Sequence, residues 1–260
     1  MIGRHFYYWH IRYWLWRVLN PAKPYELYYA DVVNKKLRRY GDHPAIGHKA
    51  QAIRTSTELL DLTRRHGMQP HHRFVDYGCG SLRLGKAVVE YLEPGNFCGM
   101  DVTQTFLDLG ADFLGTEMYA AKQPHLAVIA PDNLAAAKAR KPDFIASWHV
   151  CSKIPDSEVD RYFGGILGLM SPTTQTFIQF PQTPQRKRMN SLNWSFSKAE
   201  FRAIIRRLAP GMNVEFVEIV PENSAGVTES YAHLSYQPLH RAAPSRQTEA
   251  VTGKATAAAQ

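Results

Sequence analysis

The sequence predicts an α/β protein, a three-layer sandwich with helices on both faces of a mostly parallel, seven-stranded sheet and a helical extension in front of it. From residue 72 onward, short apolar runs alternate with helical segments, which is the pattern of parallel strands joined by helices. The 260 residues, 45% of them hydrophobic, suffice for one such domain and its extension. The predicted strands are 73–77, 96–101, 126–130, 143–148, 174–180, 214–220 and 230–236.

The first segment, residues 4–20, predicts an amphipathic helix rich in aromatic residues. Its apolar side is formed by Tyr7, Tyr8, Ile11, Trp14, Leu15, Val18 and Leu19. The pattern is irregular, because the opposite, polar side also carries Phe6, Trp9, Tyr13 and Trp16. Arg12 and Arg17 interrupt the apolar run, which therefore falls short of the roughly 20 residues of a membrane span. No small-residue cleavage site of a secretory signal is present. Two interpretations remain: contact with a membrane surface, where Trp, Tyr and Arg are favoured, or a helix packed over the core or the active site.

Charge and cysteine content exclude several classes of protein. The net charge of +8 lies at the front, since residues 1–66 hold 12 Lys and Arg against 5 Asp and Glu, whereas residues 67–260 hold 19 against 18. The nearly neutral main part argues against a broad nucleic-acid surface, and the basic front fits an anionic surface or substrate. Cys79, Cys98 and Cys151 are too far apart for a zinc motif or a disulfide framework. We therefore expect no metal site and a cytoplasmic location.

Proline and glycine residues between 21 and 47 predict a linker zone around a short helix, and a longer helix is expected from about 48 to 66, ending at Gly67. Ser197 and Glu200 form an S-x-x-E capping box at the start of another helix, which Pro210-Gly211 ends. The tail from about Ala242 has a disordered composition. The predicted domains are an extension at 1–67, a main domain at 68–240 and a tail at 241–260.

The most informative motif is the segment from Arg73 to Gly85. An apolar strand ends in Asp76, turns through Gly78, Cys79 and Gly80, and then enters a helix. Glycines let a ligand approach the backbone closely, and the following helix N-terminus offers free N–H groups. The turn therefore predicts a ligand site.

A second acidic residue, Asp101, ends the next predicted strand, 25 residues after Asp76. Neighbouring parallel strands bring such residues to one edge of the sheet, where a carboxylate can accept both hydroxyls of a ribose. The alternative is structural, with Asp101 capping the helix that starts near Thr103.

The motif Val75-Asp-Tyr-Gly-Cys-Gly80, followed by Gly-Met-Asp101, resembles the class I S-adenosylmethionine-dependent methyltransferase family over residues 70 to 236. The resemblance implies a Rossmann-like fold and S-adenosyl-L-methionine as cofactor. It implies that Asp76 and the 78–80 turn hold the methionine part and that Asp101 binds the ribose. It further implies that Asp132 and Asn133 contact adenine and that Ser147, Trp148 and His149 lie beside the transferred methyl group.

The chain departs from the family pattern D-x-G-x-G-x-G at its third glycine, which is Leu82 here, with the next glycine at Gly85. This change leaves Arg83 as a partner for a carboxylate or as a solvated helix residue. A nicotinamide oxidoreductase is the main rival, but its G-x-G-x-x-G spacing would require a glycine at position 83. No Tyr-x-x-x-Lys pair follows downstream either.

Two further rivals remain. A nucleic-acid methyltransferase would use the basic, aromatic front segment, but the Asn/Asp-Pro-Pro-aromatic loop of base-amino enzymes is absent at 147–150. The third is a non-catalytic, cofactor-binding scaffold.

The resemblance predicts methyl transfer to a small molecule, a lipid or a glycan precursor. His149 and His233 are the candidate bases, because imidazole accepts protons near neutral pH. Trp148 and the loop from Thr183 to Trp194 are the expected walls of the substrate site, since they follow the carboxyl ends of predicted strands.

Overall fold

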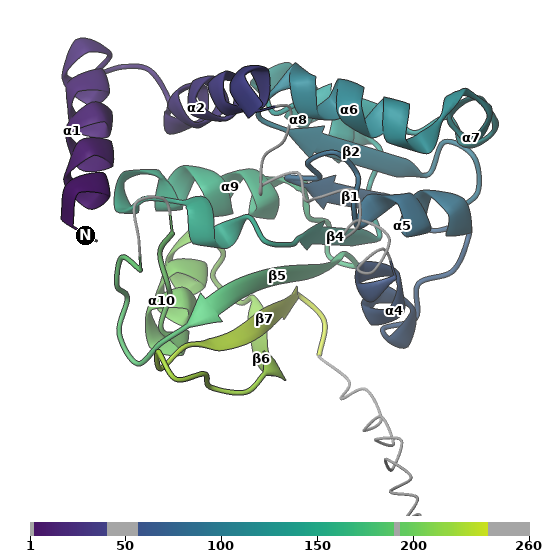
Figure 1. Cartoon of the computed structure of the whole chain (residues 1–260). Coiled ribbons are helices and arrows are strands. Elements are labelled where there is room, and N and C mark those ends of the chain that lie inside the picture. The colour runs from purple at the N-terminus through teal and green to yellow at the C-terminus, as the bar shows by residue number, and fades with distance from the viewer. Residues whose placement is uncertain (1–2, 41–56, 190–192, 239–260) are drawn as a thin grey trace, which may run out of the picture.

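The computed structural model of this protein describes residues 3–40, 57–189 and 193–238, and it contains a seven-stranded sheet (Figure 1). The strand order is β3-β2-β1-β4-β5-β7-β6, in which β1 to β5 are parallel and β7 is antiparallel to both β5 and β6. The predicted fold class is thus confirmed. The strands are β1 (Phe74–Tyr77), β2 (Phe97–Asp101), β3 (His125–Val128), β4 (Phe144–Ser147), β5 (Gln175–Gln182), β6 (Asn213–Val220) and β7 (Thr228–Ser235).

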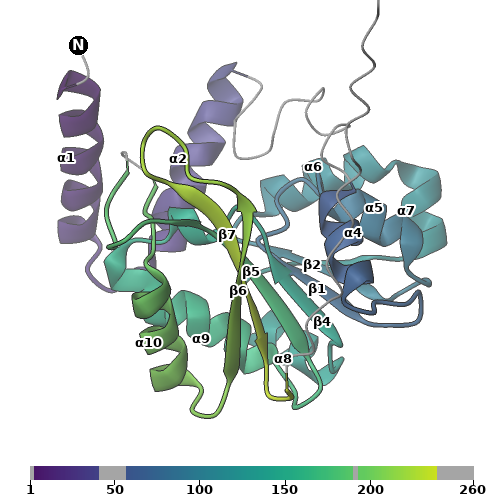
Figure 2. The ribbon, with the colours of Figure 1, turned by 90° about the horizontal axis from the view of Figure 1, so that it is seen from below.

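The central strands are continuous apolar runs because helices cover the sheet on both sides. Figure 2 shows the two helical layers on either side of the twisted sheet. The helices of one layer are α4 (Glu58–Arg65), α5 (Gly85–Tyr91), α6 (Gln104–Leu114) and α7 (Thr116–Lys122). Those of the other are α8 (Pro131–Ala139), α9 (Val159–Leu169) and α10 (Lys198–Leu208), with short turns η1 (Cys151–Lys153) and η2 (Asp156–Glu158).

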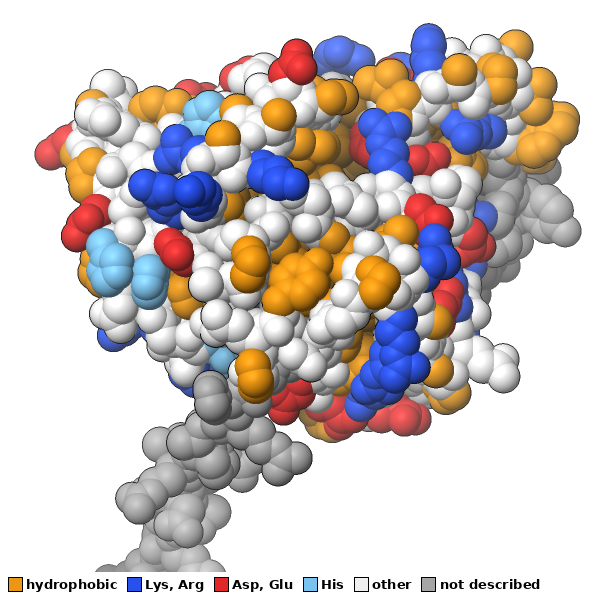
Figure 3. Space-filling model, turned by 180° about the vertical axis from the view of Figure 1, so that it is seen from behind, with side chains coloured by type: hydrophobic (Ala, Val, Ile, Leu, Met, Phe, Trp, Pro, Cys, Tyr) orange, Lys and Arg blue, Asp and Glu red, His pale blue; other side chains and the backbone are white. Residues whose placement is uncertain are grey.

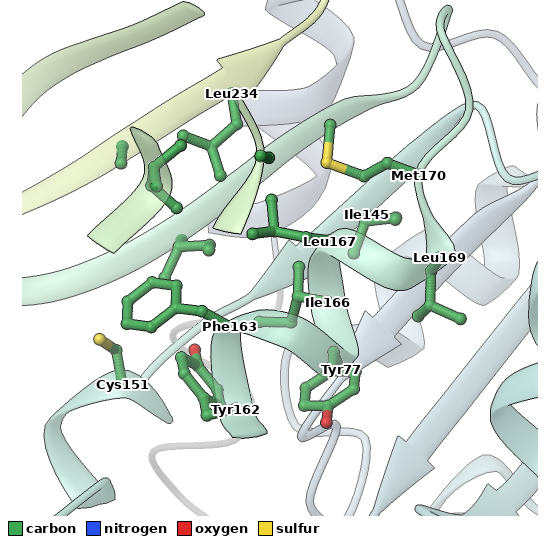
Figure 4. Close-up of a cluster of buried hydrophobic side chains, with 14 of the residues drawn as sticks. Tyr77, Ile145, Cys151, Tyr162, Phe163, Ile166, Leu167, Leu169, Met170 and Leu234 are labelled. Carbon is green, nitrogen blue, oxygen red and sulfur yellow. The ribbon is translucent and has the colours of Figure 1, made fainter. Parts of the chain in front are cut away.

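Each layer encloses its own hydrophobic core. On the α9 side, Ile145 of β4, Phe163 of α9 and Phe201 of α10 are fully buried in one cluster. Figure 4 shows part of this cluster, with side chains of α9 gathered against the strands. On the α5 side, Phe74 and Phe97 stack with ring centroids 5.9 Å apart. These two cores fix the positions of the strand ends that carry the polar residues.

Three predicted helix ends are confirmed, whereas the short helix expected in the linker zone between residues 21 and 47 is the 16-residue α2 (Tyr25–Tyr40). The Ser197 hydroxyl accepts a hydrogen bond from the Glu200 amide at 3.1 Å, as the capping box requires, and Gly211 ends that segment with a φ of +87°. α4 ends at Arg65, and Gly67 follows with a φ of +91°. The part of the predicted 48–66 helix before Thr57 lies outside the described residues, as does the predicted disordered tail.

The N-terminal extension forms α1 (Gly3–Leu19) and α2 (Tyr25–Tyr40), which lie beyond the carboxyl ends of the parallel strands (Figure 1). An aromatic cluster joins the two helices: the rings of Tyr13 and Trp16 lie 5.0 and 5.4 Å from that of Tyr28. None of the helices in the described part of the chain combines the length and the apolar character needed to cross a membrane.

Candidate functional site

The glycine turn between β1 and α5 is bonded directly to β2. The amides of Gly78 and Cys79 both donate to the carbonyl of Met100, at 2.7 and 3.0 Å. Gly78 has a φ of +89°, and a Cβ on it would lie 2.3 Å from Cγ2 of Val150, at the end of β4. Gly80 also has a positive φ, of +55°. The turn therefore requires glycine at position 78 for both its conformation and its packing.

Asp101 holds this turn in place from the end of β2. Its Oδ2 accepts the Gly80 amide at 2.8 Å and its Oδ1 accepts the Val102 amide at 2.7 Å. Burial raises the pKa of Asp101 to about 6, although backbone hydrogen bonds from Gly80, Val102 and Thr103 oppose the shift. A carboxylate has about four lone-pair positions, so one remains for a further donor beside these three backbone amides. Asp101 thus fits a ligand that presents a hydroxyl group.

Asp76, near the end of β1, is a second buried carboxyl beside the first. Its side chain is only 3% exposed, and burial together with the nearby charge of Asp101 raises its pKa to about 7. A buried carboxylate without a compensating cation is unfavourable. The pair therefore fits a ligand that carries a positive charge next to a hydroxyl group, such as the amino acid and ribose parts of S-adenosylmethionine.

Leu82 occupies the position of the third family glycine, and the structure shows how this is accommodated. It adopts a left-handed φ of +61° and is completely buried. Its side chain packs against α6, where a Cβ on Gly110 would lie 2.9 Å from Leu82 Cγ. Burial of a leucine contributes about 1.5–3 kcal/mol, which offsets the roughly 1–2 kcal/mol of left-handed strain.

Helix α2 covers the strand ends next to this pair, a feature that sequence reasoning missed. The Asn34 amide donates to the Thr103 hydroxyl at 3.2 Å, which ties α2 to the start of α6. Tyr29 lies near enough to Asp101 that the carboxylate helps to raise its pKa, after burial as the main cause. Tyr29 and Asn34 are therefore added to the candidate site. The run of tyrosines at 25, 28 and 29 could have signalled Tyr29, whereas no pattern in the sequence marks Asn34.

A polar cluster lies at the same edge of the sheet, beyond β4, β5 and β7. The His149 amide donates to Gln179 Oε1 at 3.0 Å, and the Gln179 side-chain amide donates to Glu229. Lys153 bonds to Asn193, and the Glu229 charge acts on it. We refer to His149, Lys153, Gln179, Glu229 and Asn193 as the edge cluster.

His149, the first candidate base, belongs to this cluster and has a left-handed φ of +61°. Its imidazole reaches solvent, yet desolvation by the surrounding chain and the nearby cations of Arg83 and Lys153 lower its pKa to about 4. The ring is therefore neutral at pH 7 and able to accept a hydrogen bond or a proton.

The second candidate base, His233, is buried within the sheet. It is 3% exposed, stacks on Phe177 with centroids 4.5 Å apart, and neither ring nitrogen has a hydrogen-bond partner among the described residues. Burial and the neighbouring His66 lower the pKa of His233 to about 3. The structure thus places His233 against the core on the α5 side of the sheet, apart from the edge cluster.

Ser147 and Trp148, at the end of β4, are both engaged within the protein. The Ser147 hydroxyl donates to the Tyr77 carbonyl at 2.8 Å and lies 2.8 Å from the Tyr162 hydroxyl. It is buried on the opposite face of the sheet from Asp76, because side chains alternate along a strand. Trp148 is 5% exposed, and its Nε1 donates to Glu58 of α4 at 3.2 Å.

The four other predicted cofactor residues differ in burial and in their contacts. Burial raises the pKa of the Cys79 thiol well above its ordinary value, so the thiol stays protonated within the turn. Arg83 is half-buried, and burial lowers the pKa of its guanidinium while the charge of Glu58 opposes the shift. Asp132 is exposed in the first turn of α8, and Asn133 donates to the Val128 carbonyl at 2.8 Å.

Trp194 lies in a separate cleft of about 690 Å³, between α1 and the loops before α9 and α10. Tyr13 of α1 lines the cleft, and Arg188 lies over the Trp194 ring at 5.0 Å. Across residues 3–40, 57–189 and 193–238, no group of three or more His, Cys, Asp or Glu side chains is arranged to hold a metal ion.

Comparison with known proteins identifies the fold. No protein-family model and no curated protein sequence matches the chain, but solved structures do. Magnesium protoporphyrin IX methyltransferase from Synechocystis PCC 6803, solved with bound S-adenosylmethionine, matches with a TM-score of 0.54 and 15% identity, over 82% of this chain and 98% of that one. An S-adenosylmethionine-dependent methyltransferase from Leishmania major matches with a TM-score of 0.53 and 14% identity, over 78% and 82%.

A third similar structure has a different reaction in its name. The cyclase SpnF matches with a TM-score of 0.53 and 12% identity, over 68% of this chain and 80% of that one. Likeness at such identities establishes the fold, and the chemistry must be argued from the site itself.

Proposed function

Because the chain has the fold of the class I S-adenosylmethionine-dependent methyltransferases, we propose that it is a methyltransferase that uses this cofactor. The observation that carries the proposal is the pair of buried carboxyls, Asp76 and Asp101, at the ends of adjoining strands beside the Gly78–Gly80 turn. The proposed substrate is a small molecule, a lipid or a glycan precursor.

The proposed cofactor site follows the chemistry of these groups. Asp76 would bind the ammonium group of the methionine part, because a buried carboxylate is stabilised by a cation. Asp101 would accept a ribose hydroxyl on the lone pair that the backbone amides of Gly80, Val102 and Thr103 leave free. Asp132 and Asn133 would contact adenine from the end of β3. When bound, the cofactor supplies an electrophilic methyl group on a sulfonium.

The proposed acceptor site is the edge cluster. Methyl transfer needs the acceptor atom to be aligned with the methyl group, so positioning groups matter more than an obligatory base. Gln179 fixes the His149 backbone and orients Glu229 through its two hydrogen bonds. His149 and Glu229 would accept hydrogen bonds from the hydroxyl or amine that receives the methyl group. The cleft lined by Trp194 is the proposed site for a more distant part of the substrate.

The rival functions have less support. A nicotinamide oxidoreductase is disfavoured by the glycine spacing, since G-x-G-x-x-G would require a glycine at position 83. A nucleic-acid methyltransferase and a non-catalytic scaffold have no specific observation in their favour. They differ from the proposal in what they bind, which a titration can measure.

The test is calorimetric titration of the purified chain with S-adenosylmethionine and S-adenosylhomocysteine, with NAD and NADP as controls. We expect micromolar binding of the two sulfur nucleosides and none of the dinucleotides. Binding of a dinucleotide alone would replace the proposal with the oxidoreductase. Binding of none of the four would favour the scaffold.

Substitution Asp101→Ala is expected to weaken S-adenosylmethionine binding by about 1–3 kcal/mol, because a charged acceptor for a ribose hydroxyl is lost. The same titration measures this change. The matched control is Asp112→Ala, which removes an exposed carboxylate from the same helix-and-strand unit. Equal affinities for the two variants would remove Asp101 from the cofactor site.

A further inference from the structure

We propose that the outer face of α1 docks on the surface of an anionic lipid bilayer, with the helix lying in the plane of the interface. This face consists of Ile11, Trp14, Leu15, Val18 and Leu19, called here the outer stripe. The proposal does not depend on the reaction that the chain catalyses.

The outer stripe is apolar, yet the protein leaves it uncovered. Its side chains are 46% to 78% exposed, which is unusual for so many large apolar residues on one helix. The inner face of α1 is already used, because Tyr13 and Trp16 pack against Tyr25 and Tyr28 of α2. The stripe therefore has no role in holding α1 to the body. Figure 3 shows hydrophobic side chains gathered where α1 lies, at the upper right, with Lys and Arg nearby.

The positive charge of α1 favours an anionic bilayer over a second copy of the chain as the binding partner. Helix α1 holds Arg4, Arg12 and Arg17 and no Asp or Glu. A second copy of the chain would bring two such basic ends together, and their repulsion opposes a dimer through this face. An anionic bilayer is complementary to it, since basic residues are attracted to acidic headgroups and tryptophan rings favour the headgroup level. Helix α1 is apolar on both faces, and the outer stripe is the face that the described residues leave uncovered and available to an interface.

Because of where α1 lies, docking would also place the candidate site near the membrane. Both N-terminal helices lie beyond the carboxyl edge of the sheet, where Asp76, Asp101 and the edge cluster are found (Figure 1). Docking through the outer stripe would bring this edge of the protein close to the lipid. A substrate dissolved in the bilayer would then have a short path to the site.

The test is co-sedimentation of the full chain with vesicles of phosphatidylcholine and phosphatidylglycerol in equal parts, compared with vesicles of phosphatidylcholine alone. We expect binding to the anionic vesicles, weakened by added salt, and little binding to the neutral ones. Leu15→Gln/Val18→Gln should reduce this binding at least about tenfold, because two apolar side chains no longer enter the interface.

The matched control is Ile219→Gln/Val220→Gln, which replaces two exposed apolar side chains on β6 and should bind like the unchanged chain. Circular dichroism and thermal unfolding must be the same for both variants, so that loss of folding is distinguished from loss of docking. The proposal is overturned if the unchanged chain stays in the supernatant, if Leu15→Gln/Val18→Gln sediments as before, or if the same substitution instead dissolves a dimer seen by light scattering.

Discussion

Asp76→Asn is expected to raise the thermal stability of the cofactor-free protein and at the same time to abolish measurable binding of S-adenosylmethionine. Burial and the neighbouring Asp101 raise the pKa of the Asp76 carboxyl from 3.8 to about 7. A carboxyl whose pKa is raised by folding stabilises the native state at low pH. This stabilisation is lost as the pH rises through the folded-state value.

Between pH 4 and pH 7 the ionisation of Asp76 therefore lowers the free energy of unfolding, on the order of 2–4 kcal/mol for a shift of this size. Asparagine has nearly the same shape and no charge, so the variant avoids this loss. The midpoint of thermal unfolding should rise by roughly 5–15 °C at pH 8, given about 2–4 °C per kcal/mol for a domain of this size. At pH 5 the gain should be less than half as large, because folded Asp76 is then protonated and only its ionisation in the unfolded chain, above pH 3.8, still favours unfolding.

Thermal unfolding followed by circular dichroism at pH 5 and pH 8 measures this effect, with Asp112→Asn as the exposed control. The cofactor gives an independent check on the unchanged chain. Its affinity should fall about tenfold for each pH unit below about 7, because the cation binds only to the ionised carboxyl. If Asp76→Asn shifted the unfolding midpoint equally at both pH values, the raised pKa of the Asp76 carboxyl in the folded protein would be contradicted.

The second large effect is expected for Gly78→Ala. The added Cβ would lie 2.3 Å from Cγ2 and 3.2 Å from Cγ1 of Val150, and the residue would keep a φ of +89°. The left-handed conformation costs about 1–2 kcal/mol for alanine, and the overlap adds about 1–3 kcal/mol. We expect a lower free energy of unfolding in urea and the loss of cofactor binding, since the loop after β4 must move.

Gly95→Ala separates the two contributions. Gly95 has a similar φ of +79°, but a Cβ there would meet no atom within 4 Å, so only the conformational part should appear. Val150→Ala combined with Gly78→Ala should recover much of the difference, because the two overlapping methyl groups are removed. Equal destabilisation by Gly78→Ala and Gly95→Ala would mean that the Val150 side chain moves aside without lowering the free energy of unfolding.

The strands were predictable because their signal is local. Each observed strand lies within two residues of its predicted run at either end, since a buried parallel strand needs only a short apolar segment between turns. The glycine turn was likewise predictable from a short segment. Its neighbour Asp101 accepts the amides of Gly80 and Val102, whereas the N-cap residue of α6 is Thr103 and not Asp101. The roles assigned to these residues toward a ligand stay predictions.

The remainder of the site depends on contacts between distant parts of the chain. Gln179 and Glu229 are 50 residues apart and meet only because β7 lies between β5 and β6, an order that no short pattern encodes. The covering by α2 similarly depends on the contact between Asn34 and Thr103, 69 residues apart. Ser147 shows a different limit of the sequence. It lies at a strand end, as predicted, but its side chain faces the α9 layer.

The buried Leu82 affects how much conformational entropy the loop loses when a ligand binds. A glycine at this position would relax the backbone but remove the anchor that holds the loop against α6, leaving a segment that samples many shapes. With leucine, the loop keeps one shape in the empty protein, and its amides are secured by bonds from Leu82 to Cys79 and from Lys86 to Leu82. Binding at this loop then resembles a rigid fit, with little loss of chain entropy when the ligand arrives.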